Sequence, residues 1–418
     1  MSQYTFVGPI TQLLPMVGLP LKGAISDEEL PVWESCGILL EGSRIFEIGD
    51  YGDLAEKAKD LKAKILVLES PCVVLPGWID AHTHICFEGS RARDYADRNS
   101  GATYQEIAQR GGGIWDTVTQ TRKADQDTLS QGVVRRANTH LQNGVTTIEV
   151  KSGYGLDVQE ELKMLRAIRE ADSRTPADLI PTCLAAHIPP KDFPGGASIY
   201  LDVLEQELLP VLLRENLSKR IDAFIEKGAF SPKIILPYLK KAKEMGFQLT
   251  LHADQFSTGG SEIAVACEAL SADHLEASTE KEIQLLAGSS VIAMALPGAS
   301  LGLGCAFAPA RKLLDAGGAV AIASDHNPGS APMGDLLTQA SILGAFEKLS
   351  NAEILAGITF RAAAALDKQD RGVLQKGFLG DFIIFSTAHY NEILYHQGSL
   401  KPESVWKNGK QVFPINNQ

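Results

Sequence analysis

Eight times between residues 74 and 325, an apolar run rich in β-branched residues ends in polar side chains and gives way to a helical stretch. Near-continuous apolar strands that alternate with helices indicate a parallel sheet covered on both faces, and eight such units fit a closed (β/α)8 barrel of the TIM type. In such a barrel the chemistry lies at the carboxyl ends of the strands. The predicted strands lie in VVLPGWIDAHTH, GVTTIEVKSGYG, ADLIPTCLAAH, RIDAFIEKGAF, FQLTLHADQ, LSADHLEA, VIAMALPG and AVAIASDHNPG.

Short β-like segments also occur at both ends of the chain. CGILLEGSRIFEIG and AKILVLES precede the barrel, and DFIIFST, SVWKNG and KQVF follow it. Because isolated short strands cannot bury a face alone, the two ends are expected to combine into one sheet. We therefore predict a small, discontinuous β-sandwich domain from residues 1–73 and 374–418, and a catalytic barrel domain of residues 74–373.

Charge and composition exclude several kinds of partner. The net charge of -12 repels polyanions, so we expect neither nucleic acid nor a membrane surface as a partner. The six cysteines form no C-x-x-C pair, and the N-terminus lacks a charged segment followed by an apolar core, which together predict a reduced, cytoplasmic protein. No apolar run reaches the ~18 residues of a membrane span. A small anionic substrate would need a local cationic pocket.

Polar side chains that can bind a metal collect at the predicted strand ends. His82 and His84 are two residues apart on the first strand, so both face the same side and can chelate one ion. An H-x-H pair alone is equally well explained as two satisfied polar side chains. The wider set is much harder to obtain by chance, because five of the nine histidines and one aspartate end predicted strands: His82, His84, His187, His252, His274 and Asp325.

Four of these side chains form a plausible ligand set for one divalent ion. His82, His84, His252 and Asp325 supply three neutral imidazoles and one carboxylate without a thiolate, which suits Zn or Fe better than Mg or Ca. A divalent ion of this kind lowers the pKa of a bound water molecule to about 7, so it can activate water at neutral pH. The sequence therefore predicts a metal-dependent hydrolase.

Longer motifs resemble a known family. PGWIDAHTH on the first strand and SDHNPG on the eighth resemble the amidohydrolase superfamily, whose members combine a (β/α)8 barrel with a β-sandwich. HTHICFEGSR, RGGGIWDTVTQTR, KSGYGLD, LHADQFS, SADHLE and SDHNPGSAP are similar to the imidazolonepropionases of histidine degradation, and the similarity spans essentially the whole chain. The resemblance implies hydrolysis of the cyclic amide of 4-imidazolone-5-propanoate to N-formimidoyl-L-glutamate by metal-activated water.

The resemblance also implies roles for particular residues. Arg91, on the loop after the first strand, is placed to bind the propanoate through two hydrogen bonds. The implied catalytic residues are Asp325, His274 and Gln255, and the implied substrate contacts are Arg91, Tyr154, His187, Gln255, Asn327, Gly329 and Ser330.

The sequence departs from the family pattern at two positions. Several relatives carry glutamate at position 255, and because glutamine cannot take a proton, we assign Gln255 to hydrogen bonding of the ring. Proton transfer then falls to Asp325 and His274, although His274 has the alternative role of orienting Asp325. His326 replaces a bulky aromatic residue and is interpreted as structural. The remaining histidines, His140, His389 and His396, are predicted to be surface or packing residues.

Three other interpretations were weighed. The segment RGGGIWDTV lacks the G-K-[ST] ending of a phosphate-binding loop, so nucleotide binding is not expected. A deaminase of the cytosine or guanine type would keep the same metal ligands, but Arg91 and KSGYGLD favour an acidic substrate. The third interpretation is a scaffold protein without catalytic activity, which the complete set of predicted metal ligands disfavours. A homodimer is expected only because it is the commonest closed assembly.

Overall fold

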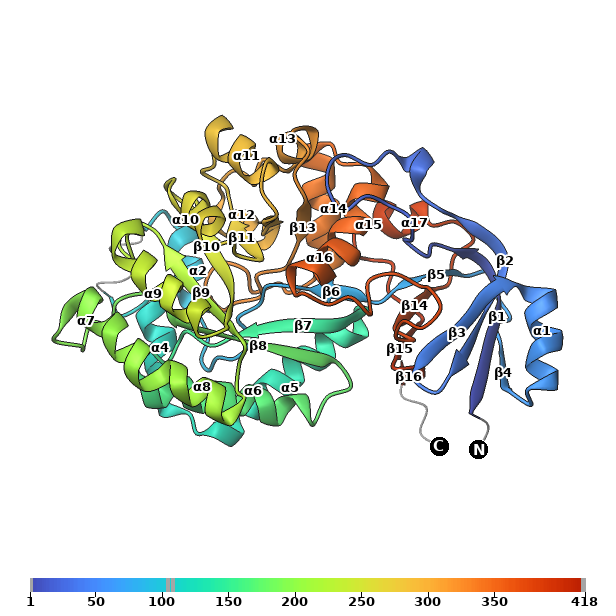
Figure 1. Cartoon of the computed structure of the whole chain (residues 1–418), viewed down its shortest axis with the longest axis horizontal. Helices are drawn as coiled ribbons and strands as arrows, with labels where there is room; N and C mark the ends of the chain where they lie inside the picture. The colour runs from blue at the N-terminus through green and yellow to red at the C-terminus, as the bar shows by residue number, and fades with distance from the viewer. Residues whose placement is uncertain (1–2, 103–105, 107–109, 415–418) are drawn as a thin grey trace.

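The computed structural model describes residues 3–102, 106 and 110–414. Eight parallel strands follow one another around a barrel in sequence order, which confirms the predicted (β/α)8 architecture. Helices surround these strands on the outside (Figure 1). The barrel strands are β6 (Trp78–Asp80), β7 (Val145–Lys151), β8 (Asp178–Ala186), β9 (Arg220–Ile225), β10 (Gln248–Ala253), β11 (Ser271–His274), β12 (Ile292–Ala295) and β13 (Val320–Ile322).

The barrel closes where its first and last strands meet. Thr83 and His326 form a parallel bridge just beyond the ends of β6 and β13. Asp325 N donates to His82 O at 3.0 Å, and His84 N donates to His326 O at 2.9 Å. Closure therefore brings Asp325 beside the two histidines of the first strand, although the chain separates them by more than half its length.

The covering helices arise from amphipathic sequence between the strands. In α6 (Val158–Asp172), buried Leu162, Leu165 and Ile168 recur at helical spacing, and Asp157 caps the first turn by accepting from Gln159 N and Glu160 N. The other main helices around the barrel are α2 (Ala92–Asn99), α4 (Ile114–Lys123), α5 (Gln126–Gln142), α7 (Gly196–Val203), α8 (Leu209–Glu215), α9 (Pro232–Glu244), α10 (Gly260–Ala266), α11 (Glu280–Ala287), α12 (Pro297–Leu303), α13 (Ala310–Asp315), α14 (Leu336–Glu347), α15 (Asn351–Gly357) and α16 (Phe360–Ala365).

Both ends of the chain contribute to a second sheet of eight strands. Strand β1 pairs antiparallel with β2 and parallel with β4 and β5, and β14 continues the sheet by pairing antiparallel with β5. The two termini consequently lie on the same side of the molecule (Figure 1). The limits of the two domains stay a prediction. The strands are β1 (Tyr4–Leu13), β2 (Trp33–Glu41), β3 (Arg44–Asp50), β4 (Lys64–Val67), β5 (Val73–Pro76), β14 (Phe382–Phe385), β15 (Ser404–Lys407) and β16 (Lys410–Phe413).

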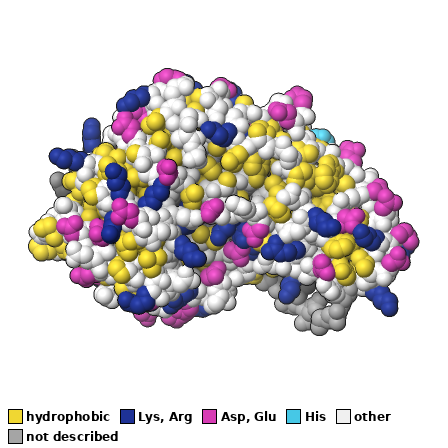
Figure 2. Space-filling view, in the orientation of Figure 1, with side chains coloured by type: hydrophobic (Ala, Val, Ile, Leu, Met, Phe, Trp, Pro, Cys, Tyr) yellow, Lys and Arg dark blue, Asp and Glu magenta, His cyan; other side chains and the backbone are white. Residues whose placement is uncertain are grey.

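Helix α1 (Tyr51–Asp60) covers part of this second sheet through a small apolar cluster that includes Phe6, Leu39 and Leu54. In the face drawn in Figure 2, acidic and basic side chains are interspersed, and no single sign of charge dominates it. None of the helices in the described part of the chain is both long enough and apolar enough to cross a membrane.

Candidate metal centre and active site

Three histidines converge inside the mouth of the barrel. His82 and His84 follow β6, His252 lies on β10, and one nitrogen of each lies within 4.8 Å of the others. The Nε2 atom of His84 is 3.2 Å from Nε2 of His82 and 3.3 Å from Nε2 of His252. When an ion is coordinated tetrahedrally with metal–nitrogen bonds of about 2.0–2.1 Å, its ligand nitrogens are about 3.3 Å apart. The spacing therefore fits one shared ion.

Two carboxylates fix the orientation of these rings from behind. His82 Nδ1 lies 2.6 Å from Asp273 Oδ2, and His252 Nδ1 lies 2.9 Å from Asp222 Oδ2. With Nδ1 held by a carboxylate, each ring directs the lone pair of Nε2 towards the centre. Burial and nearby positive groups lower the pKa values of His82 and His84 well below the ordinary range. Both imidazoles are consequently neutral, as a metal ligand must be.

Of the residues that the structure describes, Asp325 supplies the carboxylate that faces the centre. Its Oδ1 atom lies 3.5 Å from His82 Nε2 and 3.4 Å from His84 Nε2. Among the described residues, no hydrogen-bond donor satisfies this buried oxygen. A buried carboxylate oxygen facing unprotonated nitrogens is unfavourable unless a cation lies between them. The donor set and the unsatisfied oxygen therefore fit a divalent metal ion.

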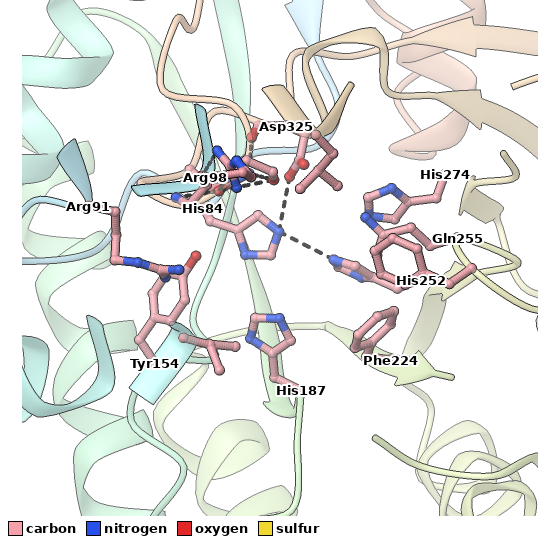
Figure 3. A pocket seen from close by; sticks show the side chains of 16 residues that line it. His84, Arg91, Arg98, Tyr154, His187, Phe224, His252, Gln255, His274 and Asp325 are labelled. Carbon is pink, nitrogen blue, oxygen red and sulfur yellow. Dashed lines mark hydrogen bonds and ion pairs between the residues drawn. The ribbon is translucent and has the colours of Figure 1, made fainter. Parts of the chain in front are cut away.

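A cavity of about 180 Å³ opens directly onto these groups. Figure 3 shows His84 near its middle, with Arg91 and Tyr154 on one side and His274, Gln255 and His252 on the other. A space of this size accepts a small molecule and excludes a folded polymer. Its lining is His84, Arg91, Arg98, Ile114, Tyr154, His187, Phe224, His252, Gln255, Phe256, His274, Leu303, Asp325, Asn327, Gly329 and Ser330.

Two arginines give the cavity a cationic side. Arg91 lies immediately before α2 and pairs through Nε with Asp94 of the same helix, while its NH1 group lies 3.4 Å from Thr117 Oγ1. Arg98, one helix turn further on from Asp94, donates to Gly329 O at 3.4 Å. The pair with Asp94 holds the Arg91 guanidinium in place, so it does not have to be ordered when an anion enters.

The KSGYGLD segment forms a rigid loop at the cavity wall. Glu161 accepts hydrogen bonds from the backbone nitrogens of Gly153, Gly155 and Leu156 at 2.8–3.0 Å. His187 Nδ1 contacts Gly153 O at 2.9 Å, where φ is +107° and an added Cβ would meet Leu184. The structure thus holds His187 against this loop.

His274 and Asp325 both have unusual backbones. Their φ values are +89° and +50°, in a region that costs a residue with a side chain about 1–3 kcal/mol. His274 Nδ1 lies 3.5 Å from Glu276 Oε2, and Ser300 Oγ donates to the other Glu276 oxygen at 3.2 Å. Burial lowers the pKa of His274, but the carboxylates of Glu276 and Asp325 outweigh it, and the pKa is raised overall.

The loop after β13 uses its own polar groups to hold its shape. Asn327 Oδ1 accepts from the backbone nitrogens of Gly329 and Ser330, both at 2.8 Å, and its Nδ2 donates to Asp325 O at 2.7 Å. All four of these residues line the cavity. The Asn327 amide is therefore engaged mainly in shaping the loop, which leaves backbone groups of the loop to meet a ligand.

The structure brings every residue predicted for the site to the cavity or to the metal cluster. Sequence reasoning missed Arg98, Phe224, Glu276 and the two carboxylates behind the histidines. Asp222 and Asp273 carried a usable signal, since each is an acidic residue inside a short barrel strand. Such a residue must have a partner in the barrel interior.

His140, which is buried, and His326, which is half-buried, contact each other away from the cavity. His140 Nε2 lies 2.9 Å from His326 Nδ1, and His140 Nδ1 lies 3.5 Å from Asp80 Oδ2. Burial lowers the pKa of His140 to about 4 and that of His326 to about 3. Both are packing residues in this arrangement.

Comparison with known proteins agrees with this geometry. The sequence profile of the amidohydrolase family matches residues 73–412. The imidazolonepropionase of Bdellovibrio bacteriovorus is 38% identical over 409 residues, which cover 97% of this chain and 95% of that protein. That of Bacillus cytotoxicus is 38% identical over 391 residues, covering 92% and 90%.

Solved structures resemble the fold at much lower identity. A triazine hydrolase variant has a TM-score of 0.75 at 18% identity, with 98% of this chain and 94% of that chain covered. A zinc-bound adenosine deaminase from Xanthomonas campestris has a TM-score of 0.69 at 17% identity, covering 98% and 92%. At these identities the similarity concerns the fold alone.

Proposed function

Because this chain belongs to the amidohydrolase family and is a metal-dependent hydrolase, we propose that it opens the ring of 4-imidazolone-5-propanoate to give N-formimidoyl-L-glutamate. The main observation behind the proposal is that one small cavity combines cationic side chains with the metal cluster. Its cationic side presents Arg91 and Arg98, and the metal cluster opens into the same space. A small anion that also contains a hydrolysable amide matches both features. The names of the curated relatives support the same substrate.

We propose a task for each of the main side chains around the cavity. The Arg91 guanidinium binds the propanoate carboxylate, with Arg98 beside it, and this anchors the substrate at the end away from the reacting bond. Tyr154 and His187, whose rings lie 5.7 Å apart, border the substrate on the wall made by the KSGYGLD loop. Gln255 offers both a hydrogen-bond donor and an acceptor to the ring amide.

Hydrolysis requires water to add to the ring carbonyl carbon, the C–N bond to break, and the leaving nitrogen to receive a proton. A divalent ion held by His82, His84, His252 and Asp325 supplies Lewis acidity for this reaction. Asp325 accepts a proton from the attacking water at its carboxylate and delivers it towards the leaving nitrogen. His274 donates a hydrogen bond to the carbonyl oxygen as negative charge develops there.

We also propose the identity of the metal ion, the cellular location of the protein and its assembly state. Three imidazoles and one carboxylate favour Zn or Fe as the ion, and metal analysis of purified protein distinguishes the two. All six cysteines are free, five of them buried, which supports a reduced, cytoplasmic location. We propose a homodimer that binds no nucleic acid, and a sedimentation measurement tests the assembly state.

The proposed function is tested by substrate consumption. Imidazolone made fresh from urocanate by urocanase should lose its ultraviolet absorbance when the metal-loaded protein is added, and N-formimidoyl-L-glutamate should accumulate. Protein stripped with a chelator should be inactive and should recover with Zn or Fe. If loaded protein leaves the absorbance unchanged, the substrate assignment is wrong. Release of ammonia from a nucleobase would instead identify a deaminase.

Arg91→Met tests the carboxylate contact. Loss of a charge-assisted pair of hydrogen bonds is worth about 1.5–3 kcal/mol, so we expect KM to rise about tenfold to a hundredfold. The methionine keeps the apolar stem, and steady-state kinetics with a melting curve measure the result. Arg93→Met is the matched control, because Arg93 lies on the same helix with its side chain 75% exposed. An unchanged KM in Arg91→Met would remove this contact from the proposal.

A further inference from the structure

One buried ammonium group lies directly behind the metal cluster and has no role in the reaction described above. Lys151 ends β7, and its side chain is completely buried. Its Nζ lies 2.8 Å from Glu149 Oε1, 2.9 Å from Asp222 Oδ2 and 3.9 Å from Asp273 Oδ2. Three carboxylates therefore surround this ammonium group at the centre of the barrel, and the buried Arg220 guanidinium interacts electrostatically with the same three.

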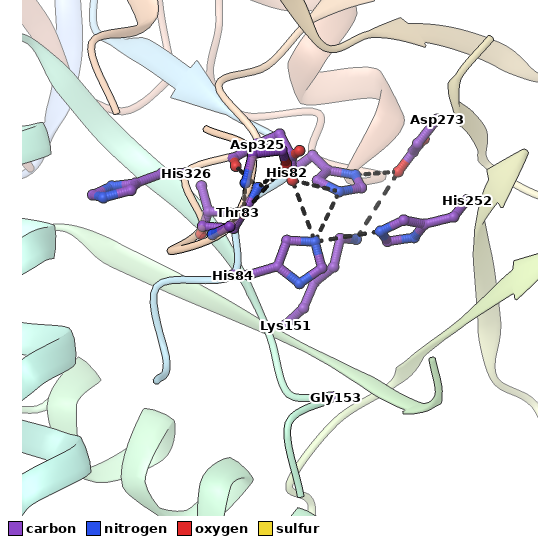
Figure 4. A network of polar contacts seen from close by, with 12 residues as sticks. His82, Thr83, His84, Lys151, Gly153, His252, Asp273, Asp325 and His326 are labelled. Atoms are coloured by element: carbon purple, nitrogen blue, oxygen red, sulfur yellow. Dashed lines mark hydrogen bonds and ion pairs between the residues drawn. The ribbon is translucent and has the colours of Figure 1, made fainter. Parts of the chain in front are cut away.

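Each of the three carboxylates contacts a different part of the metal centre. Asp273 is hydrogen-bonded to Nδ1 of His82, and Asp222 lies 2.9 Å from Nδ1 of His252, in each case through the oxygen that faces Lys151. Glu149 is 3.2 Å from the backbone nitrogen of Thr83, the residue between His82 and His84. Figure 4 shows Lys151 beneath the ligand histidines, within the same network as Asp273 and His252.

We propose that Lys151 is a positioning residue of the metal centre, which sets the placement of the carboxylates that orient His82 and His252. Two anionic side chains this close to each other would separate or take up protons if no cation lay between them. The Lys151 ammonium holds both in place, and its contact with Glu149 ties them to the segment that carries the first two ligands. The metal ligands thus share one fixed support.

A purely structural role makes a different prediction. If Lys151 only offset buried negative charge, its removal would destabilise the protein without weakening metal binding. Removing a positive charge near the site would then favour a divalent cation, and metal affinity would rise. A positioning role predicts the opposite sign, because misplaced histidines bind the ion less well. Changes of this kind in the groups that support metal ligands typically cost 10- to 100-fold in affinity.

The chain contains a matched control for this comparison. Lys407, on β15 in the second sheet, is also almost fully buried, and its Nζ lies 2.8 Å from Asp178 and 2.5 Å from Asp381. Lys407→Met removes a buried ammonium from between two carboxylates, as Lys151→Met does, but away from the metal cluster. The Lys151→Met/Glu149→Gln variant keeps the loss of Lys151 while removing one of the carboxylates that Lys151 contacts.

The test measures metal binding directly and needs no substrate. Each apoprotein is titrated with Zn²⁺ against a chromophoric chelator, and the Co²⁺ form is recorded by visible absorption, which reports ligand geometry. We expect Kd to increase about 10- to 100-fold in Lys151→Met and in the double variant, with an altered Co²⁺ spectrum. Lys407→Met should lose stability but keep the Kd and spectrum of the parent protein.

Two results would overturn the inference. One is a Kd for either Lys151 variant that is equal to or lower than that of the parent protein. The other is an equal loss of affinity in Lys407→Met, which would trace the effect to general destabilisation. Because neither readout involves catalysis, failure of the proposed substrate would leave both results interpretable.

Discussion

Asp325→Asn should reduce kcat about 10²- to 10⁴-fold while the protein stays folded. Asparagine has nearly the same shape and keeps one oxygen that can face the metal cluster, but it cannot accept a proton at neutral pH. In the structure, the Asp325 carboxylate faces both His82 and His84, and no other carboxylate lines the cavity among the described residues. Within the described part of the chain, no other carboxylate is therefore placed to take over the proton.

This prediction requires metal content to be measured alongside the rate, since Asp325 is also a proposed ligand. The variant should be reconstituted with metal to full occupancy, and kcat compared with that of the parent protein across a range of pH. Asp335→Asn is the matched control, because asparagine preserves the cap of α14 at a position outside the cavity. A metal-loaded Asp325→Asn enzyme with near-normal kcat would show that proton transfer takes another route.

The arrangement of the barrel and the ligand set was accessible from the sequence because both follow from strand ends. Parallel strands place their carboxyl ends at one rim, so His82, His84, His252 and Asp325 had to meet once the strands were identified. The family motifs then added Arg91 and Tyr154, which the structure places at the same cavity. The ligand set needed only the order of the strands and the direction of the chain, whereas Arg91 and Tyr154 needed the resemblance to the family.

Other features depended on side-chain packing, which strand order does not determine. The sequence analysis did not single out Lys151, and only the closed barrel shows it among Glu149, Asp222 and Asp273. Arg98 was not predicted as a cavity residue, because its position in the lining depends on the orientation of α2 relative to the loop after β13. Asn327 was predicted as a substrate contact, a role that stays a prediction, while its side chain shapes the loop.

The glutamine at position 255 cannot take a proton, so the proposed proton path depends on Asp325 and His274. With no carboxylate there, the charge near the reacting carbonyl depends on His274 and on Glu276 behind it. We expect His274→Gln to lower kcat about 10²- to 10³-fold with a smaller change in KM, as for the loss of one donor to a developing oxyanion. Pre-steady-state and steady-state rates measure the loss, and a variant with normal kcat would contradict the assignment.

Glu276→Gln then decides which protonation state of His274 is used. Glu276 is a main cause of the raised pKa of His274, so its neutralisation should lower that pKa. If the protonated imidazole acts, activity is lost as pH rises through the pKa, and the alkaline limb of kcat/KM moves to lower pH. If the neutral imidazole acts, the acid limb moves to lower pH instead. Glu262→Gln, at an exposed position of α10, should leave both limbs in place, and unmoved limbs in Glu276→Gln would separate Glu276 from catalysis.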